Sequence, residues 1–162
     1  MRPFACIAID PAVAARFRAS GHDDRGLAVH RMLAPADGAF PCRVCLRYAR
    51  AGEAVLLGSY DLPKPLGVYW TPSPIFVHEA PCTPYAGAGE IAEIVRHTAL
   101  VSVRAYDPQG MCLYDLGQVS DGAAVDAPLA RAMADERTEF VNIHTARPGC
   151  LLCRVERVTA AP

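Results

Sequence analysis

The chain has no long apolar segment. Its apolar runs fall well short of the roughly 20 residues that cross a bilayer. The run that begins at Phe4 is interrupted by Asp10-Pro11 before it reaches the length of a secretory signal. We therefore expect a cytoplasmic protein with no membrane partner.

An excess of charge of either sign is also missing. Sixteen Lys and Arg residues face 17 Asp and Glu residues, so the formal net charge is −1. Proteins that bind nucleic acid carry a strongly basic surface, so we expect no nucleic-acid partner. Lysine is nearly absent, with Lys64 the only one, and the positive charge therefore rests on arginine. This usage is typical of bacterial genomes rich in G and C.

The common catalytic signatures are absent as well. The sequence contains no glycine pattern for a dinucleotide, no phosphate-binding loop, no His-Glu-x-x-His and no Gly-x-Ser-x-Gly. Sequence motifs therefore indicate neither a reaction nor a substrate class, and whether the protein is an enzyme stays open.

Cysteine, in contrast, is plentiful. Seven cysteines include two Cys-x-x-Cys pairs, Cys42 with Cys45 and Cys150 with Cys153. An odd count fits poorly with a disulfide framework, and cytoplasmic thiols stay reduced. Two thiols three residues apart bind a thiophilic metal well, so zinc at these four cysteines is one hypothesis. The wide separation of the pairs weakens it. A strand through Cys150 and Cys153 would also place the two side chains on opposite faces, unless Pro148-Gly149 turns the chain.

Two further interpretations of the thiols stay open. A mixed zinc site would combine His78, Cys82 and His144 with Cys42 or Cys150, because imidazole and thiolate both suit this ion. Otherwise the cysteines are redox-active, or they are small buried hydrophobic residues without chemistry.

The pattern of apolar residues and turns predicts an α+β fold. Asp10 and Pro11 begin a helix that ends at Ser20-Gly21. Asp107-Pro108-Gln109-Gly110 is typical of a type I turn and predicts a hairpin of residues 99–106 and 111–119. Further strands are expected over residues 4–9, 28–33, 54–60, 74–78, 140–144 and 150–158, and further helices over 91–97 and from 126. We expect one domain over residues 1–162, with a mainly antiparallel sheet and about three short helices.

Polar residues concentrate near the ends of these predicted strands. Loops on a rigid sheet commonly carry binding sites, and arginine binds carboxylate or phosphate through two parallel hydrogen bonds. The leading hypothesis is therefore a module that binds a small anion or metabolite. The candidate ligand-binding residues are Cys42, Arg43, His78, Asp107, His144, Arg147 and Cys150. The alternative is that the arginines pair with nearby carboxylates and fasten the loops.

Four ordered motifs resemble a known family. They are Phe-Pro-Cys-Arg-Val-Cys-Leu at 40–46, Pro-Ile-Phe-Val-His at 74–78, Arg-Ala-Tyr-Asp at 104–107 and Arg-Pro-Gly-Cys-Leu-Leu-Cys-Arg-Val-Glu-Arg at 147–157. Together they resemble the bacterial domain-of-unknown-function family DUF1203 over nearly the whole chain. The resemblance implies a bacterial, cytosolic protein without an assigned activity. It does not indicate the oligomeric state.

Overall fold

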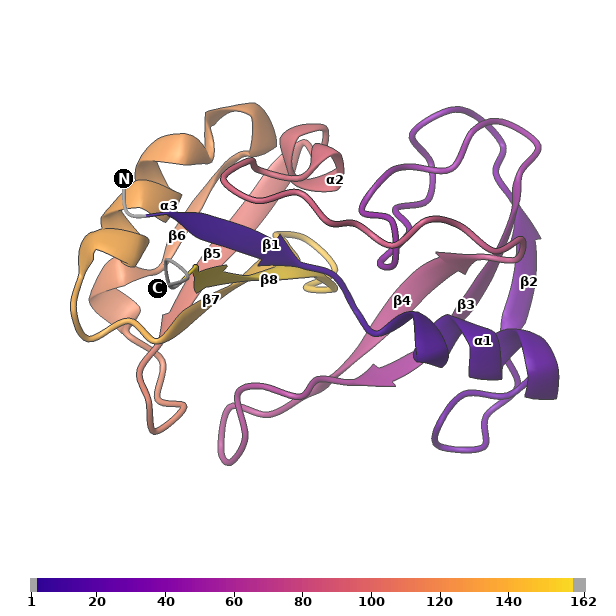
Figure 1. Ribbon diagram of the computed structural model, residues 1–162, viewed down its shortest axis with the longest axis horizontal. Coiled ribbons are helices and arrows are strands. Elements are labelled where there is room, and N and C mark those ends of the chain that lie inside the picture. Colours follow the sequence, from indigo (N-terminus) through magenta and orange to yellow (C-terminus); the bar gives the residue numbers. More distant parts are fainter. Residues whose placement is uncertain (1–2, 159–162) are drawn as a thin grey trace.

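Residues 3–158 are described by a computed structural model, in which two antiparallel sheets lie next to each other (Figure 1). The five-stranded sheet has the order β1-β8-β7-β5-β6, and the three-stranded sheet has the order β2-β3-β4. Every pair of neighbouring strands is antiparallel, which confirms the α+β class and the antiparallel pairing, although the strands form two sheets. None of the helices in this part of the chain is long and apolar enough to cross a membrane.

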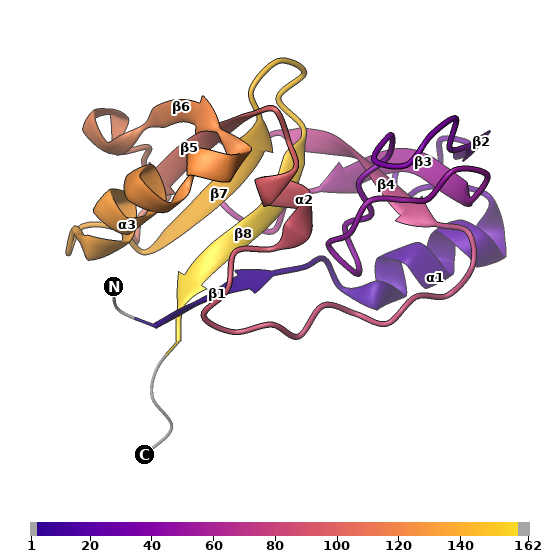
Figure 2. The same cartoon turned by 90° about the horizontal axis from the view of Figure 1, so that it is seen from above.

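The five-stranded sheet carries helices on one face (Figure 2). Its strands are β1 (Phe4–Ile7), β5 (Leu100–Tyr106), β6 (Gln118–Asp121), β7 (Phe140–Thr145) and β8 (Leu151–Arg157). The helices are α2 (Glu93–Arg96) and α3 (Asp126–Ala134). Because side chains of a strand alternate between faces, Val101 and Val103 of β5 face the helices and join the main hydrophobic core. Ser102 and Arg104 therefore lie on the opposite face.

The three-stranded sheet packs against helix α1. Its strands are β2 (His30–Leu33), β3 (Ala54–Asp61) and β4 (Pro72–His78), and α1 spans Pro11–Ser20. The Asp10 carboxylate accepts a hydrogen bond from the amide of Ala12 at 2.8 Å, and Gly21 ends the helix at φ 68°. This helix is therefore confirmed with the bounds that its capping residues predict. Phe17 of α1 lies directly over Gly58 of β3, where a Cβ atom would come within 2.6 Å of its ring.

The predicted hairpin is confirmed only in part. The turn forms as expected, because the amide of Gly110 donates to the carbonyl of Asp107 at 2.9 Å. After a bridge between Tyr106 and Cys112, however, the chain leaves the ladder in a 3-10 turn at Tyr114–Leu116. Strand β6 begins only at Gln118, so the prediction of a strand from residue 111 is wrong. Asp115 and Gly117 disfavour extended structure, and the turn buries Leu116 in the core.

The β3–β4 loop (residues 62–71) links two strands of the three-stranded sheet and contacts the five-stranded sheet. It is irregular, as its prolines predict. It reaches the face of the five-stranded sheet that carries no helices. There the carbonyl of Lys64 accepts a hydrogen bond from Asn142 Nδ2 at 3.0 Å. At the beginning of β4, the Ser73 hydroxyl accepts a hydrogen bond from the amide of Leu151 at 2.9 Å. Strands β4 and β8 are thereby held together.

Candidate metal centre

The first Cys-x-x-Cys pair lies in a tight turn that we call the knuckle (residues 42–46). Cys42 bridges Phe76 of β4, and the amide of Cys42 donates to the carbonyl of Arg47 at 2.9 Å. Leu46 reverses the chain at φ 51°, a backbone conformation that is uncommon for a residue other than glycine. The side chain of Leu46 is fully buried in the main core, and this burial offsets the backbone strain. Both thiols of the knuckle consequently point to the same side.

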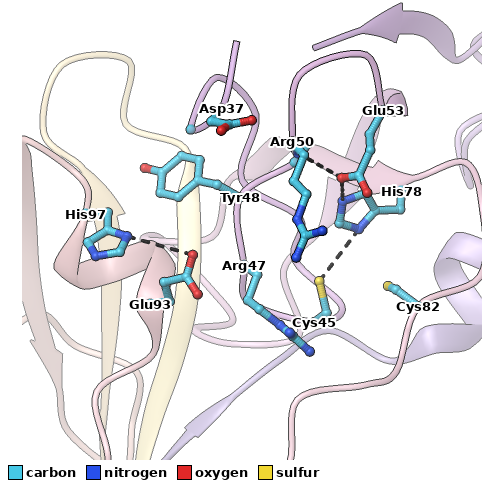
Figure 3. Close-up of a pocket in the computed structure, with 12 residues that line it drawn as sticks. Asp37, Cys45, Arg47, Tyr48, Arg50, Glu53, His78, Cys82, Glu93 and His97 are labelled. Carbon is cyan, nitrogen blue, oxygen red and sulfur yellow. Dashed lines mark hydrogen bonds and ion pairs between the residues drawn. The ribbon is translucent and has the colours of Figure 1, made fainter.

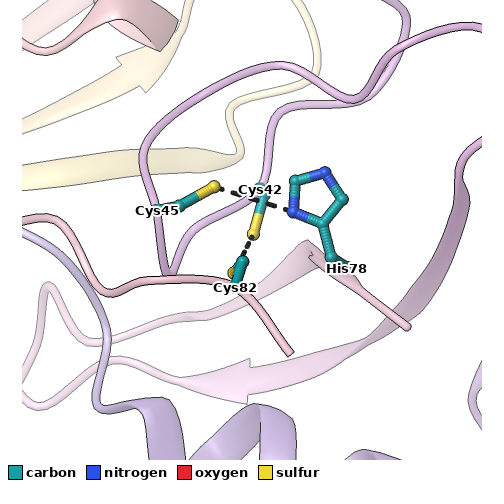
Figure 4. Close-up of side chains that lie close together, drawn as sticks. All are labelled: Cys42, Cys45, His78 and Cys82. Carbon is teal, nitrogen blue, oxygen red and sulfur yellow. Dashed lines mark hydrogen bonds between the residues drawn. The ribbon is translucent and has the colours of Figure 1, made fainter. Parts of the chain in front are cut away.

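Four side chains form the ligand group, which consists of Cys42, Cys45, His78 and Cys82 (Figure 4). His78 is the last residue of β4, and Cys82 follows in the segment after it. One ligand atom from each residue lies within 4.8 Å of all the others. The Sγ atoms of Cys42 and Cys82 are 3.8 Å apart, and Cys45 Sγ is 3.6 Å from His78 Nδ1. Tetrahedral zinc requires about 3.8 Å between two sulfur ligands and about 3.6 Å between sulfur and nitrogen.

Hydrogen bonds within the ligand group favour negative charge on one sulfur atom. The side chain of Cys45, together with that of His78, lowers the pKa of the Cys42 thiol to about 3, against the effect of burial. The same interaction raises the pKa of Cys45, while burial raises the pKa of Cys82 to about 11. A thiolate is the form in which cysteine binds a metal, so Cys42 is prepared for a thiophilic cation, whereas Cys45 and Cys82 would release their protons as the cation binds.

A carboxylate lies behind the imidazole. Nδ1 of His78 faces the sulfur atoms, and Nε2 lies 3.4 Å from Glu53 Oε2, which also accepts a hydrogen bond from the amide of Arg50 at 2.8 Å. Among the described residues, this buried Nε2 has no other polar partner and no aligned hydrogen bond. Histidines that bind metals generally direct their second nitrogen at a carboxylate or carbonyl. The surroundings of His78 therefore fit a metal ligand.

Arg43, within the knuckle, is a buried cation without a carboxylate partner in residues 3–158. Its Nε donates to the carbonyl of Leu151 at 2.7 Å, and it also donates to the carbonyl of Pro41. Burial lowers the pKa of Arg43 to about 10, and the neighbouring thiols Cys150 and Cys42 act in the opposite direction. A divalent ion with three thiolates and a neutral imidazole carries about one net negative charge. Arg43 can balance that charge.

An open cavity of about 590 Å³ lies beside the ligand group (Figure 3). Cys45, His78 and Cys82 form part of its wall. The other ionisable side chains at its wall include both acidic and basic residues, namely Asp37, Arg47, Arg50, Glu53, Glu93 and His97. Of these, Glu93 and His97 face each other at 3.8 Å. The mixed charge of this wall favours no single kind of ligand.

The second Cys-x-x-Cys pair does not join the ligand group. Cys153 is buried on β8 next to Cys6 of β1, and Cys6 together with burial raises the pKa of Cys153. Cys150 lies in the turn before β8, where its amide donates to Thr145 Oγ1 at 3.0 Å. The structure therefore brings Cys42 and Cys45 together with His78 and Cys82, and not with Cys150 and Cys153. Their place is taken by His78 and Cys82, which the mixed-site hypothesis combines with His144 and either Cys42 or Cys150. The structure leaves His144 and Cys150 out of the group.

The residues predicted to form one ligand-binding pocket are also divided. Cys42 and His78 belong to the ligand group, while His144 lines a separate cavity on the five-stranded sheet. The Asp107 carboxylate accepts hydrogen bonds from two amides of its own turn, and Arg147 is exposed in the β7–β8 turn. Arg43 lies within the knuckle, close to the thiols of Cys42 and Cys150. Sequence reasoning missed the role of Glu53, because only the pairing of β3 with β4 brings it to His78.

Comparison with known proteins gives one match. A family model described as "Protein of unknown function (DUF1203)" matches residues 39–157, which is more than half of the chain and includes the whole ligand group. No curated protein and no solved structure shows a significant match.

Proposed function

The chain belongs to the DUF1203 family of proteins of unknown function, and we propose that it binds one zinc ion through Cys42, Cys45, His78 and Cys82. The observation that carries this proposal is the distance set of the ligand group. Its two contacts of 3.8 and 3.6 Å equal those of a tetrahedral site with three thiolates and one imidazole. Ca²⁺ and Mg²⁺ prefer oxygen ligands, whereas soft thiolates select zinc among the common divalent ions.

The proposed ion is structural. All four tetrahedral positions come from the protein, and such closed sites leave no position for a reactive water. The ion would join three segments that no disulfide connects, since all seven cysteines are free. These segments are the knuckle, the end of β4 and the chain around Cys82. Zinc would thereby fix the positions of Cys45 and Cys82, which form part of the wall of the open cavity.

Metal analysis of the intact protein tests the proposal. Untagged protein purified without chelator is assayed for zinc, and its reactive thiols are counted in native buffer before and after chelation. We expect about one zinc ion per chain and three cysteines of the ligand group that react only after chelation. Protein without stoichiometric metal, even after incubation with Zn²⁺, would overturn the proposal.

Two cysteine variants identify the ligands. Cys82→Ser removes one proposed ligand, and Cys150→Ser changes a half-buried thiol outside the ligand group. We expect zinc to be lost from the first and kept by the second. If Cys82→Ser fails to fold, Co²⁺ bound to the unaltered chain provides a second measurement, because visible bands of tetrahedral cobalt with thiolate charge transfer report the same ligand set. An octahedral spectrum would contradict the assignment.

A further inference from the structure

A second cavity, of about 320 Å³, lies between the β3–β4 loop and the face of the five-stranded sheet that carries no helices. It contains none of the residues of the ligand group. Strands β5 and β7 form its floor, where Ser102 pairs with His144 and Arg104 pairs with Asn142. Side chains of alternate residues point to the same face, so these four polar groups lie together. The volume is at the lower end of the range for small-molecule sites.

His144 lines the cavity and carries an unused hydrogen-bond acceptor. Only 3% of the residue is exposed, and its Nδ1 lies 2.9 Å from the carbonyl of Gly149. A carbonyl can only accept, so Nδ1 carries the hydrogen. Burial, with a smaller effect of Arg104, lowers the pKa of His144 to about 4 and keeps the ring neutral. Nε2 is then an acceptor, and within the described chain it has no partner. A buried polar atom without a partner calls for an explanation.

Arg104 offers a positive charge. Its Nε donates to Ser102 Oγ at 3.2 Å, and no carboxylate among residues 3–158 forms an ion pair with it. None of the described residues that line the cavity is acidic. Apart from a contact with the Tyr106 hydroxyl group, the remaining guanidinium donors are available to a carboxylate, which can accept two parallel hydrogen bonds from them.

Three tyrosines supply aromatic surface at the same cavity. The ring of Tyr69, from the β3–β4 loop, meets those of Tyr106 and Tyr114 edge to face, with centroids 6.3 and 6.1 Å away. The hydroxyl groups of Tyr69 and Tyr114 are 2.6 Å apart, which fixes the position of the loop. Aromatic rings prefer such offset or edge contacts with other rings. A planar apolar group would therefore pack well against this wall.

We propose that this cavity binds a small aromatic carboxylate that carries a hydroxyl group. The carboxylate pairs with Arg104, the hydroxyl group donates to Nε2 of His144, and the ring packs against the tyrosines. Each part of the ligand corresponds to one property of the cavity: an unpaired charge, an unpaired acceptor and an aromatic wall. The site is independent of zinc binding, since it shares no residue with the ligand group.

Calorimetric titration with hydroxybenzoates tests the proposal. The probes are 3-hydroxybenzoate and 4-hydroxybenzoate, because the diagonal placement of Arg104 and His144 across two strands suits a short ligand. Benzoate lacks the donor, and 4-hydroxybenzamide lacks the charge. We expect a hydroxybenzoate to bind with a Kd well below 1 mM, benzoate about tenfold more weakly, and the amide more weakly still. Failure of both hydroxybenzoates to bind below the millimolar range would overturn the proposal.

Two arginine variants locate the binding. Arg104→Gln removes the proposed anion partner, whereas Arg147→Gln changes an exposed arginine outside the cavity. We expect affinity for the hydroxybenzoate to fall by about tenfold to a hundredfold in Arg104→Gln and to stay unchanged in Arg147→Gln. Because Arg104 is partly buried, the fold of its variant is checked by circular dichroism. If that variant does not fold, the site is located in the unaltered protein by the NMR chemical-shift changes that the hydroxybenzoate causes at the backbone amides. Shifts centred on β5 and β7 support the site, and shifts elsewhere contradict it.

Discussion

The two sheets of this protein are stabilised in different ways. The five-stranded sheet and its helices share one large aliphatic core, which includes the fully buried Val103, Leu129 and Ile143. The three-stranded sheet has a smaller core, and two of its buried members are the thiols Cys42 and Cys45. Apolar burial stabilises a fold in proportion to the area removed from water. The region with less of it is also the one that holds four side chains suited to a metal, so the proposed ion would add stability where the core is smallest.

Removal of the metal should separate the two regions most clearly. Structural zinc contributes several kcal/mol to the folding of small domains, on the order of 10 kcal/mol in isolated peptides. We expect chelation to accelerate amide exchange throughout the knuckle, β3 and β4, and to leave β5 and β7 protected. Hydrogen exchange followed by mass spectrometry with and without chelator measures this. Equal acceleration in both sheets would show that the regions unfold as one unit.

The opposite test truncates the aliphatic core. Leu129 of α3 is fully buried, so Leu129→Ala leaves a cavity and should lower the free energy of unfolding by about 2–5 kcal/mol. Its zinc content should stay the same, because the residue lies in the other region. Urea denaturation and metal analysis give the two values. Leu33→Ala, at an exposed site of β2, is the control and should change stability little. Loss of zinc from Leu129→Ala would contradict the separation of the regions.

The free energy of unfolding should also depend on pH, through a histidine of the five-stranded sheet. Burial lowers the pKa of His144 from 6.5 to about 4. Between pH 6.5 and 4, His144 is therefore protonated in the unfolded chain and neutral in the folded chain. Stability is therefore complete above pH 6.5, falls as the pH drops toward 4, and loses about 3 kcal/mol over that range. His144→Asn should remove this part of the decline. Urea denaturation at several pH values checks it, and His22→Asn, an exposed histidine, should keep the decline. Identical profiles for all three proteins would refute the prediction.

The sequence predicts those features that depend on neighbouring residues. Helix α1 follows from Asp10, Pro11 and Gly21, and the turn at Asp107–Gly110 follows from its own four residues. The helix and turn signals act within one turn of chain, and tertiary packing has little influence on them. The Cys-x-x-Cys spacing marks Cys42 and Cys45 as a pair, but it marks Cys150 and Cys153 equally, and these lie outside the ligand group.

The partners of Cys42 and Cys45 depend on contacts that are distant in the sequence. His78 reaches the knuckle because Cys42 bridges Phe76 of β4, and Cys82 follows in a segment without regular structure. Neither contact leaves a periodic pattern in the sequence. Cys150 and His144 had equally suitable ligand atoms, so residue type alone did not distinguish them from Cys82 and His78. Local spacing identifies Cys42 and Cys45, and the mixed-site hypothesis names His78 and Cys82 among its candidates, but only the pairing of strands shows which candidates meet.

The smallest expected effect lies at the boundary of the ligand group, at Glu53. Its carboxylate lies behind His78, 3.4 Å from Nε2, and loss of such an outer contact typically weakens metal binding by about 10- to 100-fold. Glu53→Gln should therefore release zinc at a lower concentration of a competing chelator, while the unfolding of the five-stranded sheet stays the same. Glu93→Gln is the matched control, because Glu93 lines the same cavity but contacts His97. Equal zinc affinity in both variants would mean that the sulfur atoms alone position the ion, and that the carboxylate serves only the loop around Arg50.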